Sequence, residues 1–176
     1  EQLPYFRVLL DAYGIKHYEL LDYEADDILG TLAKAADPDD QVMIVSGDKD
    51  LTQLASDQVT VYITKKGVSE LEPYTPASIW DKYQLTPEQI IDLKGLMGDA
   101  SDNIPGIPKV GEKTALKLLE QFGTVENLIA NTDQLKGKLK ENVEAFKDQA
   151  LLSKRLATIK TDVEIPFETE EFTFHI

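Results

Sequence analysis

The sequence predicts an α/β protein with a mostly parallel sheet and flanking helices, followed by a helical region. Over residues 1–73, short apolar and β-branched runs alternate with helical patterns, and this alternation is typical of parallel sheets. Beyond residue 73, the apolar residues recur at helical spacing. We therefore expect an α/β core over residues 1–73, a helical region over residues 74–160, and an acidic tail or linker over residues 161–176.

The first region contains three helical and three strand patterns. Residues 3–14 form an amphipathic pattern ending at Gly14, and glycine readily adopts the left-handed conformation that ends a helix. Residues 41–48 (QVMIVSGD) are an apolar run that ends in polar residues, as expected of a strand buried on both faces. The remaining patterns predict strands at 16–22 and 59–64 and helices at 24–36 and 51–56.

The second region contains only helical patterns. Four of them open at a threonine or glycine that can cap or turn a helix, at residues 75–83, 86–98, 111–123 and 124–131. A longer pattern covers residues 141–160. The tail sequence EIPFETEEF (164–172) alternates apolar and acidic residues, which fits either a terminal strand or a linker.

Composition limits the classes of function. The 176 residues include no cysteine, which excludes disulfides, thiolate zinc sites and cysteine nucleophiles. No apolar run reaches the ~18 residues of a membrane span and no signal peptide opens the chain, so we expect a cytoplasmic protein. Because the chain opens at Glu1 within what looks like a helical element, we expect it to be a fragment of a longer protein.

The net charge of −14 is unevenly distributed along the chain. Residues 1–108 carry 20 acidic and 8 basic side chains, whereas residues 109–160 carry 7 acidic and 10 basic ones. The average alone argues against a nucleic-acid partner. The separation of charge instead suggests that the two parts of the chain do different jobs.

Seven carboxylates occur in three clusters at the ends of predicted elements. The clusters are Glu24, Asp26 and Asp27; Asp48 and Asp50; and Asp99 and Asp102. Taken singly, each is explained by helix capping or by turn chemistry. However, two clusters follow predicted parallel strands, whose carboxyl ends meet at one edge of a sheet, so we expect the clusters to converge. So many neighbouring carboxylates cannot all stay ionised without cations.

Oxygen ligands without cysteine or a nearby histidine favour Mg²⁺ or Mn²⁺ over zinc. A pair of such ions about 3.5–4 Å apart is a recurring arrangement for phosphodiester hydrolysis. A calcium EF-hand is excluded, because the sixth and twelfth positions counted from Asp99 are Ile104 and Val110. The stretch DKDLT (48–52) also matches an Asp-x-Asp-x-Thr phosphotransferase nucleophile, although Ser46 and Gly47 separate its first aspartate from the strand.

A short turn between Gly106 and Gly111 separates two helical patterns. Pro105 and Pro108 stiffen the turn, and its glycines allow the backbone to approach another molecule. Backbone amides at the start of the following helix form an anion site, and no base-reading helix is recognisable, so we expect sequence-independent phosphate binding. The candidate contacts are Gly106, Lys109, Gly111, Lys113, Thr114 and Lys117. An ordinary helix–turn–helix connector with solvated lysines is the alternative.

Four stretches together resemble the 5′-nuclease (flap endonuclease-like) domain of bacterial DNA polymerase I: YEADD, SGDKDLTQL, GLMGDASDNIPGIPKVGEKTA and LLEQFGTVENL. The resemblance covers nearly the whole chain. It implies a structure-specific 5′-3′ exonuclease or flap endonuclease that hydrolyses DNA with divalent metal in replication and repair. It also implies a helix-hairpin-helix that binds duplex, nicked or 5′-flap DNA, often with K⁺ held by hairpin carbonyls.

The resemblance implies a role for each carboxylate. Glu24, Asp26, Asp48 and Asp50 match ligands of one metal cluster, Asp99 and Asp102 match the second site, and Asp27 matches an outer-shell position. Asp48, Asp50 and Asp99 are the expected catalytic residues. In that family a strand with another aspartate and a basic helical arch come first, so we expect them to precede Glu1 and the sheet to be incomplete. We expect a covalently linked polymerase region in the full-length protein. The alternatives are a non-catalytic helix-hairpin-helix DNA-binding fragment and an aspartate-nucleophile phosphatase.

Overall fold

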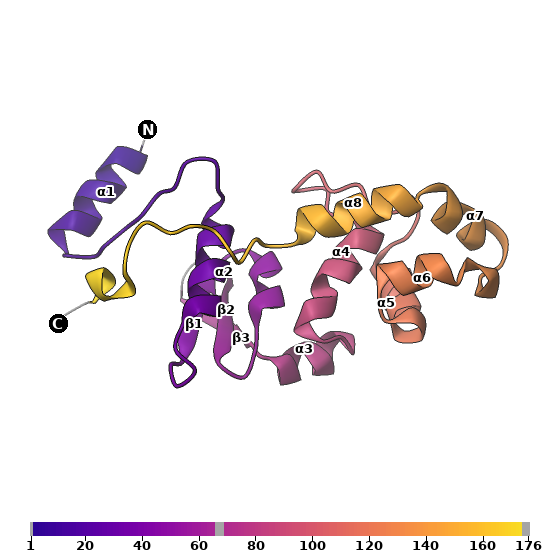
Figure 1. Ribbon diagram of the computed structural model, residues 1–176, viewed down its shortest axis with the longest axis horizontal. Helices are drawn as coiled ribbons and strands as arrows, with labels where there is room; N and C mark the ends of the chain where they lie inside the picture. The colour runs from indigo at the N-terminus through magenta and orange to yellow at the C-terminus, as the bar shows by residue number, and fades with distance from the viewer. Residues whose placement is uncertain (1, 66–68, 174–176) are drawn as a thin grey trace.

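The computed structural model describes residues 2–65 and 69–173 (Figure 1). The elements are α1 (Leu3–Ala12), α2 (Ala25–Ala35), β1 (Val42–Ser46), η1 (Lys49–Leu54), β2 (Val59–Lys65), β3 (Glu70–Tyr74), α3 (Pro76–Tyr83), η2 (Pro87–Gln89), α4 (Ile90–Met97), α5 (Glu112–Phe122), α6 (Val125–Ala130), η3 (Thr132–Gln134), α7 (Gly137–Ala145), α8 (Lys147–Ala157) and η4 (Thr169–Phe172). An α/β unit is followed by a helical unit, as the sequence predicts.

The sheet has three strands in the order β1-β2-β3, and it is mixed. β1 pairs with β2 in parallel, with Val42 opposite Val59, whereas β2 pairs with β3 antiparallel, with Val61 opposite Tyr74. The prediction of a mostly parallel sheet is therefore wrong for the described strands. The strand β3 escapes sequence analysis because its five residues, ELEPY, include a proline and two glutamates, which are uncommon in strands.

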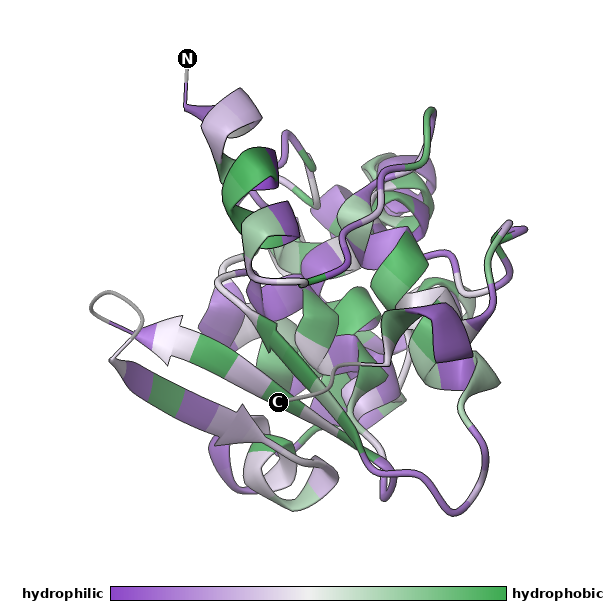
Figure 2. Ribbon diagram, turned by 90° about the vertical axis from the view of Figure 1, so that its left-hand side faces the viewer, coloured by the Kyte–Doolittle hydropathy of each residue, from purple (hydrophilic) through white to green (hydrophobic). Residues whose placement is uncertain are grey.

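The strand predicted at residues 16–22 is also wrong, because this segment contains neither helix nor strand. It has no β-branched residue, so its alternation was weak support for a strand. Tyr18 instead packs against Phe167 and Phe172, with ring centroids 4.2 and 6.2 Å away. The preceding helix α1 ends as predicted, with Gly14 at φ +67°. Figures 1 and 2 show α1 standing apart from the sheet.

Two hydrophobic cores lie side by side. The first surrounds the sheet and η1 and includes Leu51 and Val61; the second fills the helical unit and includes Leu119 and Val143. The pattern predicted as one helix at 141–160 forms two helices, α7 and α8, which meet at Phe146. Within residues 2–65 and 69–173, every helix is too short or too polar to cross a membrane.

Helices α4 and α8 cross closely at Gly95. A Cβ atom there would lie 3.0 Å from the Lys154 Cβ and 3.2 Å from the Ala150 carbonyl oxygen, so a larger residue would push the helices apart. Next to this crossing, Asp92 is 3% exposed; it pairs with Lys154 Nζ at 2.7 Å and accepts the Val125 N–H at 2.8 Å. The contact fixes the direction in which α4 enters the loop at 98–104.

After α8, residues 158–163 run back across the α/β unit, and we call them the return segment (Figure 1). Gln53 fastens its start, donating to the Ala157 carbonyl at 2.8 Å and accepting the Ile159 N–H at 3.0 Å. Further along, the Val163 N–H donates to Thr31 on α2 at 3.1 Å. These bonds hold the helical unit against α2 and η1. Residues 164–168 of the tail form no strand, and the stretch ends in the short η4 helix.

Candidate metal centre

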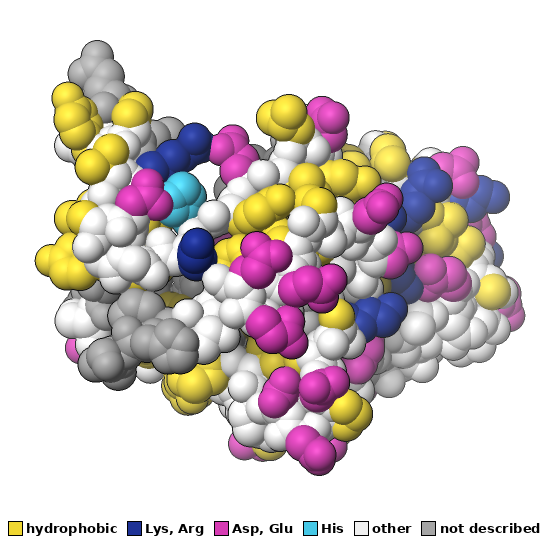
Figure 3. All heavy atoms as spheres, turned by 60° about the vertical axis from the view of Figure 1, so that its left-hand side comes forward, with side chains coloured by type: hydrophobic (Ala, Val, Ile, Leu, Met, Phe, Trp, Pro, Cys, Tyr) yellow, Lys and Arg dark blue, Asp and Glu magenta, His cyan; other side chains and the backbone are white. Residues whose placement is uncertain are grey.

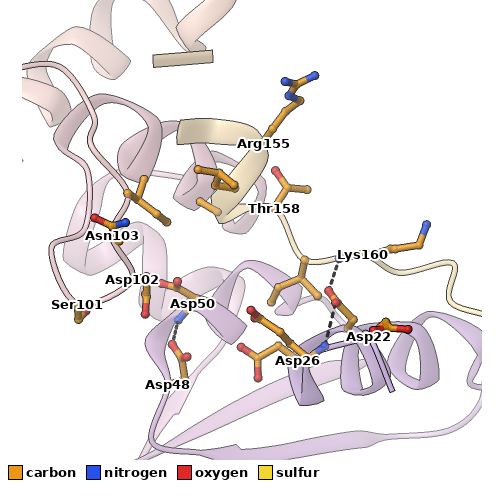
Figure 4. Close-up of a pocket in the computed structure, with 16 residues that line it drawn as sticks. Asp22, Asp26, Asp48, Asp50, Ser101, Asp102, Asn103, Arg155, Thr158 and Lys160 are labelled. Atoms are coloured by element: carbon orange, nitrogen blue, oxygen red, sulfur yellow. Dashed lines mark hydrogen bonds between the residues drawn. The ribbon is translucent and has the colours of Figure 1, made fainter. Parts of the chain in front are cut away.

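A cavity of about 690 Å³ lies between α2, η1, the loop at 99–104 and the return segment (Figure 4). Its lining is mostly acidic and polar: Asp22, Glu24, Asp26, Asp27, Asp48, Asp50, Ser101, Asp102, Asn103, Arg155, Thr158 and Lys160, together with apolar residues of the loop, the end of α8 and the return segment. Figure 4 shows Asp26, Asp48, Asp50 and Asp102 gathered around one space, with Arg155 directed away from them.

Turn chemistry holds Asp48 and Asp50 at the carboxyl end of β1. The Asp48 side chain caps η1 by accepting the Asp50 N–H at 2.8 Å, and the Ser46 hydroxyl accepts the Asp48 N–H at 3.1 Å. The carboxyl group of Asp48 stays exposed, whereas Asp50 is half-buried. The strand end therefore presents two carboxylates at different depths.

The first turn of α2 supplies the other carboxylates of the α/β unit. Asp27 faces inward to the backbone: it accepts the Lys160 N–H at 2.9 Å with one oxygen and the Glu24 N–H at 3.4 Å with the other. Asp26 lies beside Asp48 and Glu24. Burial, followed by the charges of Asp48 and Glu24, raises the pKa of Asp26 to about 6. The first two clusters therefore converge, although the described residues 2–24 ahead of α2 contain no strand that would bring them together.

Asp50, Asp99 and Asp102 form a tighter group. Each offers a carboxylate oxygen within 4.8 Å of the other two. A two-residue bridge shapes the loop, since Asp99 and Ile104 exchange both backbone hydrogen bonds at 2.8 Å. The Asp99 carboxylate accepts the Ser101 N–H at 2.9 Å. The loop thereby places Asp99 and Asp102 next to the end of β1.

The ammonium group of Lys94, on α4, lies between two of these carboxylates. Its Nζ is 2.7 Å from Asp50 Oδ1 and also contacts Asp99 Oδ2. Hydrogen bonds from Lys94 and then from Ser101 lower the pKa of Asp99 to about 2. Burial raises the pKa of Asp50 despite the nearby lysine. Sequence analysis did not predict Lys94 as a site residue. The one signal that could have pointed to it is its position five residues before Asp99, on the helix that leads into the loop.

The donors fit a hard divalent cation. Asp50 Oδ1 is buried and, among the described residues, is the one buried side-chain oxygen or nitrogen without a hydrogen bond, although it is ion-paired with Lys94. All the surrounding acidic donors are oxygens, which Mg²⁺ and Mn²⁺ prefer. Of the seven predicted carboxylates, Asp27 differs in that both its oxygens already accept backbone hydrogen bonds.

The predicted phosphate contacts fall into two groups. Gly106 is buried at φ +60°, donates its N–H to Ser153 Oγ at 2.9 Å and accepts from Gln149 Nε2 at 2.7 Å, so its amide is not free. Gly111 is open, since a Cβ added there would have nothing within 4 Å, and it precedes α5. Thr114 on α5 is half-buried. The lysines at 109, 113 and 117 are exposed, and none is ion-paired within the described part of the chain.

Acidic side chains are unevenly distributed over the surface. On the face shown in Figure 3, they gather in the middle, while lysine or arginine side chains lie on both sides, with further acidic side chains among those on the right. The acidic cavity and the hairpin lysines thus belong to different parts of the molecule, joined by α4 and the loop at 98–104.

Two family models match the chain, one after the other. Residues 1–84 match the N-terminal resolvase-like domain of 5′-3′ exonucleases, and residues 85–176 match the C-terminal SAM fold of the same family. The chain therefore belongs to the 5′-3′ exonuclease family, as its motifs indicated.

Curated relatives of this chain include DNA polymerase I proteins from bacteria. DNA polymerase I of Bacillus subtilis (strain 168) is 64% identical over 94% of this chain and 19% of its own length. DNA polymerase I of Bacillus caldotenax is 58% identical over 99% of this chain and 20% of its own length. The chain is thus similar to the 5′-3′ exonuclease domain of bacterial DNA polymerase I, and it spans about a fifth of the curated relatives it matches.

Solved structures support the fold. A T5 5′-exonuclease with bound divalent metal ions (zinc) matches with a TM-score of 0.72 and 26% identity, over 91% of this chain and 60% of that one. A bacteriophage T5 flap endonuclease in a complex with DNA and metal ions matches with a TM-score of 0.68 and 24% identity, over 89% and 56%. The second likeness, at its lower identity, concerns the fold alone.

Proposed function

We propose that this chain is the metal-binding and DNA-binding part of a 5′-3′ exonuclease or flap endonuclease that hydrolyses DNA phosphodiesters. One observation carries the proposal: carboxylates from three separate segments gather around a buried Asp50 oxygen that is ion-paired with Lys94 and makes no hydrogen bond. The similarity to DNA polymerase I makes replication and repair the proposed setting, with the polymerase region in the same protein.

The carboxylates would hold Mg²⁺ or Mn²⁺ in two groups. Glu24, Asp26, Asp48 and Asp50 line the α/β side of the cavity, and Asp102 lines its other side. Asp102 also groups with Asp50 and Asp99, which border an adjoining cavity. When bound, such ions activate water near neutral pH and stabilise charge on the reacting phosphate. Asp48, Asp50 and Asp99 are the residues we assign to catalysis. Asp27 acts on the backbone, because it joins the return segment to the start of α2.

The hairpin would hold DNA through phosphates. Lys109, Lys113 and Lys117 would supply positive charge, while the open backbone at Gly111 and the side chain of Thr114 lie at the start of α5. Phosphate contacts carry no base information, so binding should be indifferent to sequence. We assign no DNA contact to Gly106. Of the hairpin carbonyl oxygens that could hold a K⁺, those of Gly106 and Pro108 already accept side-chain hydrogen bonds.

We also propose the division of the chain at residues 1–73, 74–160 and 161–176. Two hydrophobic cores support a division into an α/β unit and a helical unit, although the first core extends past residue 73 to Tyr74, Ile79 and Ile90. The third part differs from the second in having five acidic and no basic side chains. The return segment spans the second boundary, so the tail is anchored at its start.

Cleavage of a 5′-flap DNA by the longer protein proposed to contain this chain tests the function. We expect cleavage that requires Mg²⁺ or Mn²⁺ and falls at least about 100-fold in Asp50→Asn, since even residues that only orient metal ligands contribute 10- to 100-fold. Asp57→Asn, an exposed aspartate outside the cavity, is the matched control and should be unaffected.

The two alternative functions, a non-catalytic DNA-binding module and a phosphatase, predict different results. Metal-independent DNA binding without any cleavage would support a non-catalytic module. A covalent aspartyl-phosphate at Asp48, trapped during turnover of a phosphomonoester, would support the phosphatase. Full cleavage by Asp50→Asn would refute the proposed metal site.

A further inference from the structure

The side chain of Lys94 has the position that a cation would take between Asp50 and Asp99. Its Nζ lies 2.7 Å from Asp50 Oδ1 and contacts Asp99 Oδ2, and the three side chains are 18%, 13% and 20% exposed. The group of three carboxylates that includes Asp102 is the tightest acidic cluster within the described residues. The negative charge of this group is therefore already partly neutralised by the protein itself.

We propose that Lys94 is an internal counter-ion that competes with a divalent cation for the Asp50–Asp99–Asp102 group. The inference rests on the proposed function, because it concerns the same metal site. Without the ion, the ammonium holds the carboxylates together. When the ion binds, the ammonium must leave, so Lys94 lowers the affinity of this group for metal while stabilising the metal-free protein.

Electrostatic repulsion supports competition between the Lys94 ammonium and a divalent cation for these carboxylates. A bound ion would lie about 2.0–2.6 Å from its carboxylate oxygens, and these oxygens are all within 4.8 Å of one another. An ammonium 2.7 Å from one of them would then be within a few ångströms of two further positive charges. Repulsion at such a distance is several kcal/mol at the effective dielectric of a protein surface. The ammonium and the ion therefore do not share the group in these positions.

The structure gives the lysine room to move. A cavity of about 420 Å³ opens beside it, lined by Gly47, Lys49 and Ser101 as well as by the carboxylates. Lysine has a flexible four-carbon stem, so its ammonium can shift by several ångströms while the Cα stays fixed on α4. Displacement therefore requires no movement of the helix.

A second half-buried lysine, Lys154, forms an ion pair that is purely structural. Lys154 is 16% exposed and contacts Asp92 and Glu126, both at 2.7 Å. The Asp92 oxygen that it contacts also accepts the Val125 N–H, so this carboxylate keeps a hydrogen bond without the lysine. Asp50 Oδ1 has no such second partner, which leaves it available to a competing cation.

Mn²⁺ binding without DNA tests the inference. Free Mn²⁺ is measured by electron paramagnetic resonance during titration of the unmodified chain, Lys94→Met, and Lys82→Met. Lys82 is the control because it also faces a carboxylate, Glu72, but lies on α3 outside the acidic cavity. We expect one Mn²⁺ site to tighten about 10-fold in Lys94→Met, equivalent to about 1.4 kcal/mol, and no change in Lys82→Met.

Thermal unfolding gives an independent readout. Lys94→Met should melt below the unmodified chain in EDTA, and Mn²⁺ should raise its melting temperature by a larger interval. If Lys94→Met does not fold in EDTA, Lys94→Gln is measured in the same way. Equal or weaker Mn²⁺ binding by the folded variant would overturn the counter-ion role and leave the proposed metal site standing. Absence of Mn²⁺ binding by the unmodified chain would overturn the metal site, and the counter-ion role with it.

Discussion

Neutralising Asp26 should stabilise the metal-free protein at neutral pH. Its pKa is raised from 3.8 to about 6, first by burial and then by the charges of Asp48 and Glu24. A carboxyl group with a raised folded-state pKa binds its proton more tightly in the folded protein than in the unfolded chain. Its favourable contribution to stability is therefore present below pH ~4 and is lost as the pH rises through about 6.

The size of the effect follows from the shift. About two pKa units at ~1.4 kcal/mol each set an upper limit of about 3 kcal/mol above pH 7. Asp26 is only half-buried, and solvent screens part of the repulsion, so we expect about 1–2 kcal/mol. Asp26→Asn removes the charge at nearly the same volume and should recover this amount.

The assay is urea unfolding in EDTA at pH 4.5 and pH 7.5. Asp26→Asn should be more stable than the unmodified chain at pH 7.5, and this difference should shrink to about a third at pH 4.5, which lies between the unfolded and folded pKa values. The exposed control Asp57→Asn should match the unmodified chain at both pH values. With Mn²⁺ at pH 7.5, the order should reverse, because the variant loses a proposed ligand and with it the stabilisation by bound metal. A variant that is less stable in EDTA at pH 7.5 would refute the reasoning.

Three further predictions concern the connections around the site. Gly106→Ala should lower the free energy of unfolding in urea by about 3 kcal/mol or more, because at φ +60° its Cβ would lie 2.3 Å from the Gly98 nitrogen. Gly111→Ala is the control: the space around its Cβ is open, so it should lower the free energy of unfolding by less than about 0.5 kcal/mol. Gln53→Leu should cost about 1–3 kcal/mol in the same assay, since it leaves two backbone partners at the return segment unpaired; an unchanged midpoint would contradict this role. Lys113→Ala should reduce the log–log salt slope of duplex DNA binding by about 1 without creating a base preference, as measured by fluorescence anisotropy; an unchanged slope would remove Lys113 from the interface.

Local chemistry made much of the fold predictable. Thr75 and Thr124 cap α3 and α6 as their positions before apolar helical patterns indicated, each accepting an N–H three residues later. The apolar run at 41–48 forms the strand β1 as predicted, but the expected burial on both faces is wrong: Ile44 is buried, whereas Met43 and Val45 on the opposite face are 66% and 55% exposed. The wrong predictions concern segments whose structure depends on partners far away in the sequence. Residues 16–22 alternate like a strand, but the described sheet offers them no neighbour, and Tyr18 packs on the tail instead.

The site was likewise predictable only where its geometry does not depend on contacts between distant segments. Sequence spacing predicted that the carboxylate clusters converge, and they do, but the first cluster reaches the cavity through the start of α2 and not through a strand end. The place of Lys94 depends on how α4 is rotated against the loop that follows it. That rotation is set by the crossing with α8 at Gly95, which no local pattern reveals. Likewise, Asp27 differs from its neighbours only through a backbone partner 133 residues away.

The geometry of the cavity has a consequence for how metal affects the whole molecule. Asp50 comes from the α/β unit, whereas Asp99 and Asp102 come from a loop within the helical unit, so an ion held by all three would join the two cores. The Asp27 and Gln53 bonds to the return segment make a second connection on the other side of the same cavity. Two connections between the α/β unit and the helical unit reinforce each other, because each reduces the relative motion of the units that the other would have to restrict. Breaking the return-segment bonds should therefore weaken metal binding as well as stability, although neither Gln53 nor the return segment supplies a proposed ligand. The converse follows from reciprocity: bound metal should protect the backbone amides of residues 158–163 from hydrogen exchange.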